Sequence, residues 1–353
     1  MAVGHRSLSI EGFSKMRRIV RSLALLAVST SVVFSSMAEA GATGAGSSFV
    51  YPVLSRWAAD FKKAGGDEIN YQSVGSGAGI AQIKAATVDF GATDKPLTPD
   101  ELAAAGLVQF PVVVGGIVPV VNVPGLRPGS LRLTGPVLAS IFSGQIKKWN
   151  DPAIAKLNPR IKMPGTTISI VHRSDGSGTT YNFTHYLGQV SANWRSKVGE
   201  GTTVDWPAGV GGKGNEGVAG YVKQIAGSIG YVEYAYALQN KMSHALVQNK
   251  AGRFVQPNGQ SFSAAAATVD WSKARDFYQL MTNAPGANAW PIAATTWVVM
   301  YKKPKSAAAT ASAKKFFNWS LTKGQKQAVA LDYVPLPAPL VKRIQTYMNA
   351  NIK

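Results

Sequence analysis

The 353-residue chain contains no cysteine. Disulfide bonds are therefore excluded, and so is a lipid-modified cysteine at the start of an exported product. Long apolar runs are also missing, because no segment reaches the ~20 consecutive apolar residues of a membrane-spanning helix. Histidine is scarce, and His172, His185 and His244 lack the spacing of a metal site. We therefore expect neither a metal nor a cofactor.

Residues 16–40 have the form of a secretory signal peptide. A basic start is followed by an apolar stretch at 23–34 and a small-x-small ending at 38–40. We expect cleavage near Ala40, with residues 1–15 arising from an over-extended gene start. The product is then exported, soluble and not lipid-anchored. The adjacent arginines in the basic start also fit a twin-arginine signal, although such pairs are common in ordinary signal peptides.

Acidic residues are few, with 18 Asp and Glu against 37 Lys and Arg and a net charge of +19. Residues 1–40 hold five of the basic and two of the acidic residues, so their removal lowers the charge to +16. Such a surplus suits anionic ligands, nucleic acid or acidic membranes. We expect no nucleic-acid partner, because the basic residues are scattered and form no RNP motif or block of five. A basic surface that only keeps the protein soluble explains the charge equally well.

The first part of the mature chain repeats one pattern, in which a β-type run is followed by a Gly/Ser-rich turn and a helical stripe. The turns lie at 44–49, 75–79 and 91–94, and the third leads to a capping-box sequence at 98–101. This repetition predicts an α/β protein. In open α/β sheets, ligands bind beyond the carboxyl ends of the strands, where such turns lie. We therefore expect one polar cleft lined by these turns.

A fourth turn, residues 172–180, follows a β-type run at 166–171 and opens a predicted helix. Unpaired backbone N–H groups and the positive end of the helix dipole attract anions there. The guanidinium group of Arg173 presents a fork that matches two oxygens, and Asp175 is placed to hold that fork. The hydroxyl donors of the turn are Ser177 and Thr179. The pattern indicates an oxyanion site, with an ordinary capped turn as the alternative.

The chain resembles the periplasmic phosphate-binding proteins of bacterial high-affinity phosphate ABC transporters. The motifs that carry the resemblance are residues 43–46, 89–94, 142–149, 173–179 and 230–237. The resemblance implies a two-lobe (type II) periplasmic binding protein whose hinge lets the lobes close over one dehydrated phosphate. It also implies a periplasmic monomer that delivers phosphate to a membrane permease. The expected lobes are residues 41–121 plus 291–353, and residues 122–290.

By motif position, the resemblance also implies the residues that bind phosphate. They are Ser48, Phe49, Ser76, Asp94, Arg173, Ser177, Gly178 and Thr179. Ser48 and Phe49 would offer backbone N–H groups, and Asp175 would support Arg173. Two departures are visible. Ser48 lies where threonine is common in the family, and His172 lies where some members carry a second arginine, so less positive charge is expected beside the site.

Asp94 is the one carboxylate in this set, and it would repel an anion that brings no proton. Phosphate near neutral pH keeps at least one proton, whereas sulfate keeps none. Asp94 should therefore accept a hydrogen bond from phosphate and reject sulfate or molybdate. Arsenate matches phosphate in protonation and stays open as a ligand. A strand-end aspartate that merely caps a turn is the alternative.

Other readings of the sequence have less support. Residues 211–215 resemble a nucleotide-binding loop, yet glycine follows Lys213 where a P-loop needs Ser or Thr. We expect a turn that starts a helix at the cleft rim. An exported phosphatase would need a nucleophile or a metal pair, and the G-x-S-x-G elbow around Ser177 is absent. We therefore expect no enzyme activity.

Overall fold

The structure is a computed structural model that describes residues 1–2 and 41–353. Residues 41–353 belong to one compact unit. The predicted signal peptide lies outside the described residues. Among those that are described, no helix has the length and apolar character needed to cross a membrane.

A mixed nine-stranded sheet forms the framework, and eight strands run in the order β2-β1-β3-β12-β4-β8-β6-β7, with β9 paired to β4. Their bounds are β1 Ala42–Gly46, β2 Ile69–Ser73, β3 Phe90–Thr93, β4 Leu107–Asn122, β6 Ser169–Arg173, β7 Val210–Gly212, β8 Ser228–Glu233, β9 Ser243–His244 and β12 Ala293–Tyr301. A second sheet has three short strands, namely β5 Arg132–Leu133, β10 Leu246–Gln248 and β11 Phe254–Val255.

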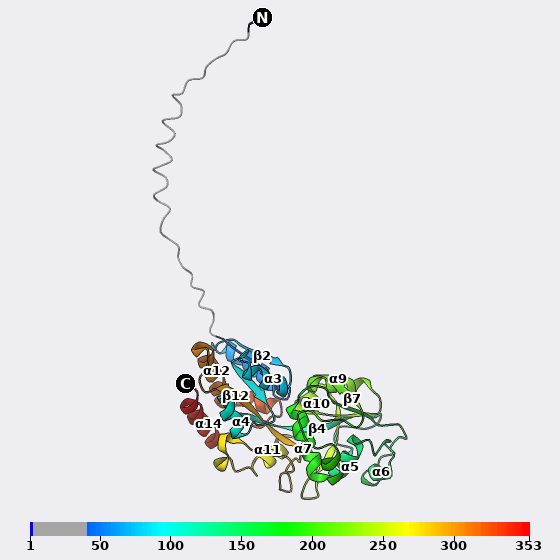
Figure 1. The fold of residues 1–353 in the computed structure, drawn as a ribbon. Coiled ribbons are helices and arrows are strands. Elements are labelled where there is room, and N and C mark those ends of the chain that lie inside the picture. The colour runs from blue at the N-terminus through cyan, green and yellow to red at the C-terminus, as the bar shows by residue number, and fades with distance from the viewer. Residues whose placement is uncertain (3–40) are drawn as a thin grey trace. The chain divides into compact units, whose positions relative to one another are not determined.

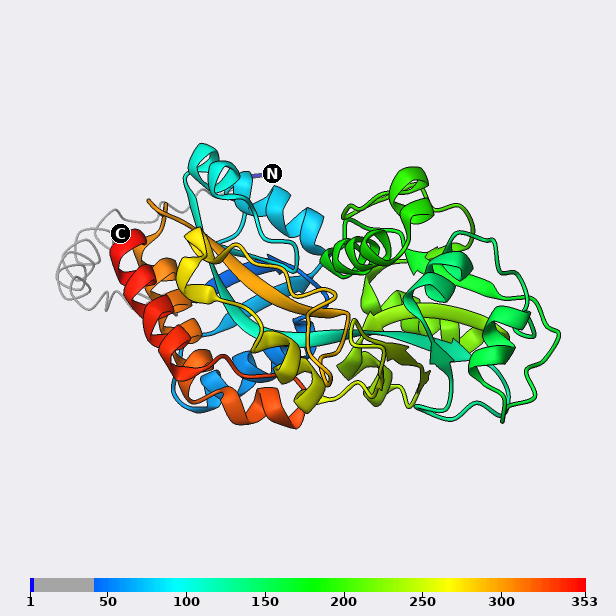
Figure 2. The ribbon, with the colours of Figure 1, turned by 90° about the horizontal axis from the view of Figure 1, so that it is seen from below.

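The long strand β4 divides the sheet into two lobes. Its residues 107–116 pair antiparallel with β12, whereas residues 117–122 pair antiparallel with β8. Lobe I is the name used for strands β2, β1, β3 and β12 together with residues 107–116 of β4. Lobe II is the name used for strands β8, β6 and β7 together with residues 117–122 of β4. Figure 2 shows the two lobes beside each other, with β4 passing from one to the other. The predicted α/β class and two-lobe arrangement are confirmed.

Two glycines mark the point where β4 changes lobes. A Cβ on Gly115 would lie 2.8 Å from the ring of Phe49, and one on Gly116 would lie 2.1 Å from the ring of Phe262. Real Cβ atoms do not come so close, so the two aromatic rings occupy space that only glycine leaves free. The strand thus crosses between the lobes with a large side chain packed on each glycine.

Helices cover the sheet in both lobes (Figure 1). The bounds in chain order are α2 Tyr51–Lys63, α3 Ser76–Lys84, α4 Pro99–Ala105, α5 Gly135–Phe142, α6 Pro152–Leu157, α7 Gly178–Val190, α8 Ala192–Lys197, α9 Gly214–Gln224, α10 Tyr234–Gln239, α11 Gly259–Ala266, α12 Ala307–Thr322, α13 Gln325–Ala330 and α14 Ala338–Asn351. Two short 3-10 helices, η2 Trp271–Lys273 and η3 Arg275–Phe277, precede β12.

Local sequence explains where the helices of lobe I begin and which face they bury. Helix α2 carries proline in its first turn and buries Leu54, Trp57 and Phe61 along one stripe. Helix α4 begins with the predicted capping box, in which Thr98 and Glu101 each accept the other's backbone N–H. The turn before α2 therefore lies at the carboxyl end of β1, and the turn before α4 lies at the carboxyl end of β3.

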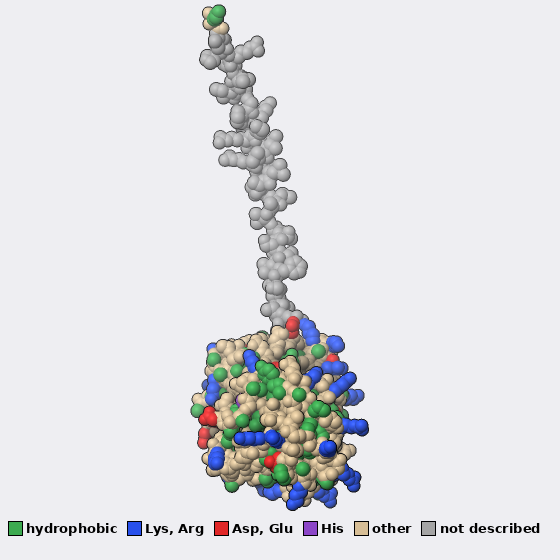
Figure 3. All heavy atoms as spheres, turned by 90° about the vertical axis from the view of Figure 1, so that its right-hand side faces the viewer, with side chains coloured by type: hydrophobic (Ala, Val, Ile, Leu, Met, Phe, Trp, Pro, Cys, Tyr) green, Lys and Arg blue, Asp and Glu red, His purple; other side chains and the backbone are tan. Residues whose placement is uncertain are grey.

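On the face that Figure 3 shows, basic side chains are spread out rather than gathered in one block. Figure 3 shows this for the face at the right-hand side of Figure 1, where Lys and Arg are more frequent than Asp and Glu. This distribution agrees with the scattered positions of the lysines in the sequence.

Candidate functional site

The turns selected from the sequence meet where the two lobes face each other. In lobe I they follow β1, β2 and β3, and in lobe II they follow β6 and β7. Six of the predicted residues have side chains among the buried polar groups, at no more than 4% exposure: Ser48, Ser76, Asp94, Arg173, Ser177 and Thr179. The structure therefore brings these hydroxyls, one guanidinium group and one carboxylate together away from water.

Asp94 is held by three hydroxyl groups of lobe I. Ser47 Oγ lies 2.7 Å from both carboxylate oxygens, and Thr296 Oγ1 donates to Oδ1 at 2.6 Å. Ser76 Oγ lies 3.4 Å from Oδ2 and accepts the backbone N–H of Asp94 at 3.3 Å. Burial raises the pKa of Asp94 from 3.8 to about 6, although the hydroxyls and Arg173 act in the opposite direction. The carboxylate is thus ionised at neutral pH but close to its titration range.

Arg173 and Asp175 form the predicted bidentate pair. Arg173 Nε donates to Asp175 Oδ1 at 2.7 Å, and Nη2 donates to Oδ2 at 2.5 Å. Burial raises the pKa of Asp175. The hydrogen bonds and the charge of Arg173 lower this pKa by more than burial raises it, so the net shift is downward. Asp175 Oδ1 also accepts the backbone N–H of Gly214 at 3.0 Å. Two fixed bonds hold the plane of the guanidinium group, and Nη1 remains directed at Thr179 Oγ1, 3.3 Å away.

The start of helix α7 packs directly on Asp94. Ser177 caps the helix by accepting the N–H of Thr180 at 3.0 Å. A Cβ on Gly178 would come within 2.7 Å of the backbone nitrogen, Cβ and Oδ2 of Asp94. Only glycine lets the first turn of α7 approach the carboxylate so closely, and this approach brings the positive end of the helix dipole to the site.

Phe49 differs in detail from the sequence-based expectation. Its ring is fully buried, and its backbone N–H donates to Ser47 Oγ at 3.0 Å. Its carbonyl accepts from Tyr333 Oη at 2.7 Å. The N–H that was predicted as a phosphate donor therefore has a protein partner in this structure.

His172 supplies no positive charge beside the site at neutral pH. Burial lowers its pKa, and its ring stacks on Trp206 with centroids 4.8 Å apart. The described residues contain no cluster of three His, Cys, Asp or Glu that could hold a metal ion.

Four residues of the network were not selected from the sequence. Ser47 and Thr296 bind Asp94, and Asn182 Nδ2 donates across the lobes to the Asp94 carbonyl at 2.6 Å. Asn215 Nδ2 donates to Ser48 Oγ at 2.9 Å, also across the lobes. Asn215 follows the glycine-rich run 211–214, which was interpreted as a turn that starts a helix. That interpretation is confirmed, since α9 begins at Gly214, but it missed the amide at the second position of the helix.

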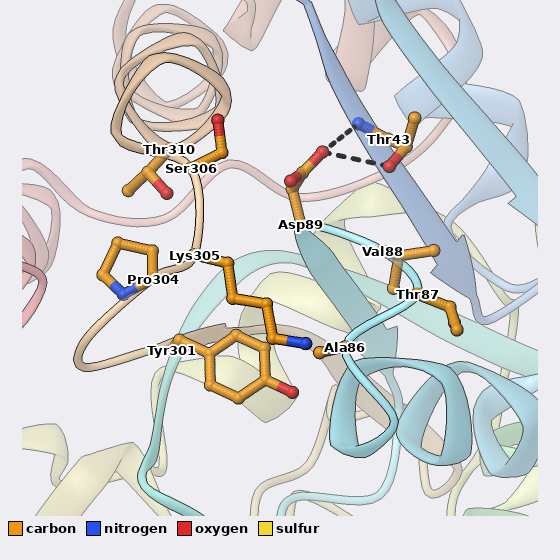
Figure 4. A pocket seen from close by; sticks show the side chains of 10 residues that line it. All are labelled: Thr43, Ala86, Thr87, Val88, Asp89, Tyr301, Pro304, Lys305, Ser306 and Thr310. Carbon is orange, nitrogen blue, oxygen red and sulfur yellow. Dashed lines mark hydrogen bonds between the residues drawn. The ribbon is translucent and has the colours of Figure 1, made fainter.

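A crevice of about 100 Å³ lies at the opposite end of the lobe I strands (Figure 4). It is lined by Thr43 at the start of β1, Asp89 before β3 and Tyr301 at the end of β12. Figure 4 shows Asp89 turned towards Thr43, whose N–H and Oγ1 donate to it at 2.8 and 3.0 Å. The carboxylate of Asp89 is thus hydrogen-bonded to Thr43. The crevice is separate from the site between the lobes.

Comparison with known proteins gives the family. A family model described as a PBP superfamily domain matches residues 35–323. The phosphate-binding protein PstS of Xylella fastidiosa (strain 9a5c) is 61% identical over 311 residues, which cover 88% of this chain and 85% of the relative. The phosphate-binding protein PstS of Haemophilus influenzae is 50% identical over 88% of this chain and 93% of its own.

Solved structures share the fold at lower identity. A high affinity periplasmic phosphate-binding protein (PfluDING), solved with phosphate bound, has a TM-score of 0.71 at 20% identity and covers 87% of this chain and 93% of its own. A phosphate binding protein from Stenotrophomonas maltophilia has a TM-score of 0.65 at 19% identity, and the match covers 88% of this chain and 95% of that protein. The chain therefore belongs to the PBP superfamily and, within it, to the family of PstS phosphate-binding proteins.

Proposed function

We propose that this protein binds inorganic phosphate between its lobes in the periplasm and delivers it to the permease of an ABC-type phosphate importer. The proposed ligand set is Ser48, Phe49, Ser76, Asp94, Arg173, Ser177, Gly178 and Thr179. The observation that carries the proposal is the burial of Arg173 beside hydroxyl donors from both lobes, with a carboxylate facing them. Family membership supports the same ligand.

A dehydrated phosphate needs many fixed donors, because each of its oxygens loses hydrogen bonds to water. Arg173 offers a permanent charge, and the first turn of α7 offers unpaired backbone N–H groups. Asp175 supports Arg173 without facing the ligand, since both its oxygens are occupied by the guanidinium group. Binding of phosphate would also draw the Phe49 N–H away from Ser47 Oγ.

Asp94 supplies selectivity in this proposal. Its carboxylate accepts a hydrogen bond from the protonated oxygen that phosphate keeps near neutral pH, whereas sulfate and molybdate would place an unprotonated oxygen against it. Arsenate keeps the same proton and is expected to bind as well.

The lobes would open and close about the strands that join them. We propose lobes of residues 41–121 plus 291–353, and of residues 122–290. The pairing of β4 supports this division, since its partner changes from β12 to β8 after residue 116. We further propose an exported monomer, held by no lipid anchor, that acts without a cofactor, a metal or a nucleic-acid partner. In its family such proteins serve transport as substrate-binding components, and we propose no enzyme activity.

Calorimetric titration of phosphate-free protein with phosphate, sulfate and arsenate tests the proposal. We expect tight binding of one phosphate per chain, binding of arsenate, and no detectable competition by sulfate. Binding of sulfate in preference to phosphate would overturn the assignment of the ligand.

A further inference from the structure

Asn215, the second residue of α9, lies fully buried between hydroxyl groups of both lobes. Its Nδ2 donates one hydrogen to Ser48 Oγ at 2.9 Å and the other to Thr179 Oγ1 at 3.2 Å. Its Oδ1 accepts the backbone N–H of Glu233 at 2.9 Å. A backbone N–H only donates, so the oxygen of the amide must face Glu233 and the NH₂ group must face the two hydroxyls.

Each of these hydroxyls has two lone pairs and a single proton. Ser48 Oγ accepts twice from Asn215, from the backbone N–H at 3.1 Å and from Nδ2 at 2.9 Å. Thr179 Oγ1 accepts from Asn215 Nδ2 at 3.2 Å and from Arg173 Nη1 at 3.3 Å. With both lone pairs occupied, each hydroxyl keeps only its proton for a further partner.

We propose that Asn215 is a positioning residue that fixes the Ser48 and Thr179 hydroxyls as donors to the bound anion. This inference rests on the proposed function and deepens it, because it assigns specificity to a residue outside the ligand set. An oxyanion must then present unprotonated oxygens to Ser48 and Thr179. Its proton must face Asp94, the one carboxylate of the proposed ligand set.

The amide also joins the two lobes through these contacts. Ser48 follows β1 of lobe I, whereas Thr179 lies in α7 of lobe II. Asn215 therefore sets the direction of both hydroxyls only when the lobes are closed, and in the open state Ser48 is free to turn its proton elsewhere. The donor arrangement is completed by closure.

The test is a double-mutant cycle on phosphate affinity, measured by calorimetry with Ser48→Ala, Asn215→Ala and the double variant. Ser48→Ala alone should weaken binding roughly tenfold to a hundredfold, the cost of a hydrogen bond to a charged group. In the Asn215→Ala background the same change should cost less than about threefold, because the Ser48 hydroxyl no longer has its direction fixed. A residue that merely stabilised α9 would leave the two factors equal.

Asn158→Ala is the matched control, because Asn158 is also buried in lobe II and bridges only backbone groups of Arg132 and Ile154. It should lower the unfolding temperature without changing phosphate affinity. If Asn215→Ala does not fold, Asn215→Asp keeps the shape and the acceptor for Glu233, and the cycle is repeated in that background. Equal losses from Ser48→Ala in both backgrounds, or an Asn215 variant that binds as wild type does, would overturn the inference. A wild-type protein that binds no phosphate would instead refute the proposed function.

Discussion

Asn182, on α7 of lobe II, uses one side-chain amide hydrogen to bond across the meeting point of the lobes and the other to bond the first residue of its own helix. Nδ2 lies 2.6 Å from the carbonyl oxygen of Asp94 and 2.9 Å from that of Gly178. Both carbonyl-bearing residues belong to the proposed ligand set. The closed arrangement of the lobes is thus tied to the backbone of the residues that would contact phosphate.

Asn182→Ala should therefore weaken closure. It leaves the buried carbonyl oxygen of Asp94 without its side-chain donor, at about 1–3 kcal/mol before water enters, whereas the Gly178 carbonyl keeps its backbone bond within the helix. We expect weaker phosphate binding and a smaller decrease of the radius of gyration on adding phosphate, measured by calorimetry and small-angle X-ray scattering. Wild-type compaction together with wild-type affinity would show that closure does not depend on this amide.

Arg173→Ala should remove the buried charge that pairs with the anion. We expect a loss of roughly 2–5 kcal/mol in binding free energy, as for truncated buried charge pairs. Arg173→Lys should recover only part of it, because an ammonium group cannot span Asp175 and the ligand as the fork does. Arg195→Ala, at an exposed position of α8, is the control and should bind as wild type. Unchanged affinity in a folded Arg173→Ala protein would place the site elsewhere.

Gly178→Ala tests the close approach of α7 to Asp94. The added Cβ would lie 2.7 Å from three atoms of Asp94, so the lobes cannot close fully and phosphate affinity should fall at least tenfold. Gly188→Ala is the matched control on the same helix, where the nearest atom outside the helix is 3.9 Å away. It should leave affinity unchanged and stabilise the protein by roughly 0.5–1 kcal/mol. Equal effects of the two substitutions would contradict the proposed contact.

The local part of the site could be predicted from the sequence, because it depends on neighbours in the chain. Arg173 and Asp175 are two positions apart in the chain, and the predicted ion pair between them is present. The two residues of the capping box, Thr98 and Glu101, are three positions apart, and the box is present as well. The strand before Arg173 was placed at 166–171, whereas β6 is Ser169–Arg173. It continues to Arg173 because that residue pairs with Gly212 of β7. Pairing with a distant strand is not visible in a local pattern.

The residues that sequence reasoning missed act over long separations. Thr296 contacts Asp94 across 202 positions, and Asn215 contacts Ser48 across 167. Thr296 lies inside strand β12 rather than in a turn. Asn215 does follow a strand and a glycine-rich turn, but it is a neutral amide and not one of the charged or hydroxyl side chains that mark the ligand loops. Ser47 was adjacent to a selected residue, and only the fold shows that its side chain turns to Asp94.

The raised pKa of Asp94 predicts a specific pH dependence of stability in phosphate-free protein. Between its ordinary value of 3.8 and about 6, the folded carboxyl keeps a proton that the unfolded one has lost. The folded state binds more protons there, so the unfolding free energy falls as pH rises through this window, by about 3 kcal/mol in total. Asp94→Asn removes this contribution. Urea unfolding of both proteins at pH 4, 5, 6 and 7 measures it, and a constant difference between them would contradict the shift.

Asp94→Asn also tests specificity, and we expect it to change what is rejected more than what is held. Asparagine keeps the shape and one acceptor oxygen, so a hydrogen bond from protonated phosphate is retained. The substitution removes a negative charge and offers an NH₂ group to an unprotonated oxygen, which turns a conflict between two acceptors into a donor and acceptor pair. Phosphate affinity should change little, whereas sulfate should become a competitor. Competition titrations on both proteins measure the two effects together. If sulfate is excluded equally well by Asp94→Asn, selectivity must come from the hydroxyl and backbone donors, and Asp94 then acts only as a cap on the turn that follows β3.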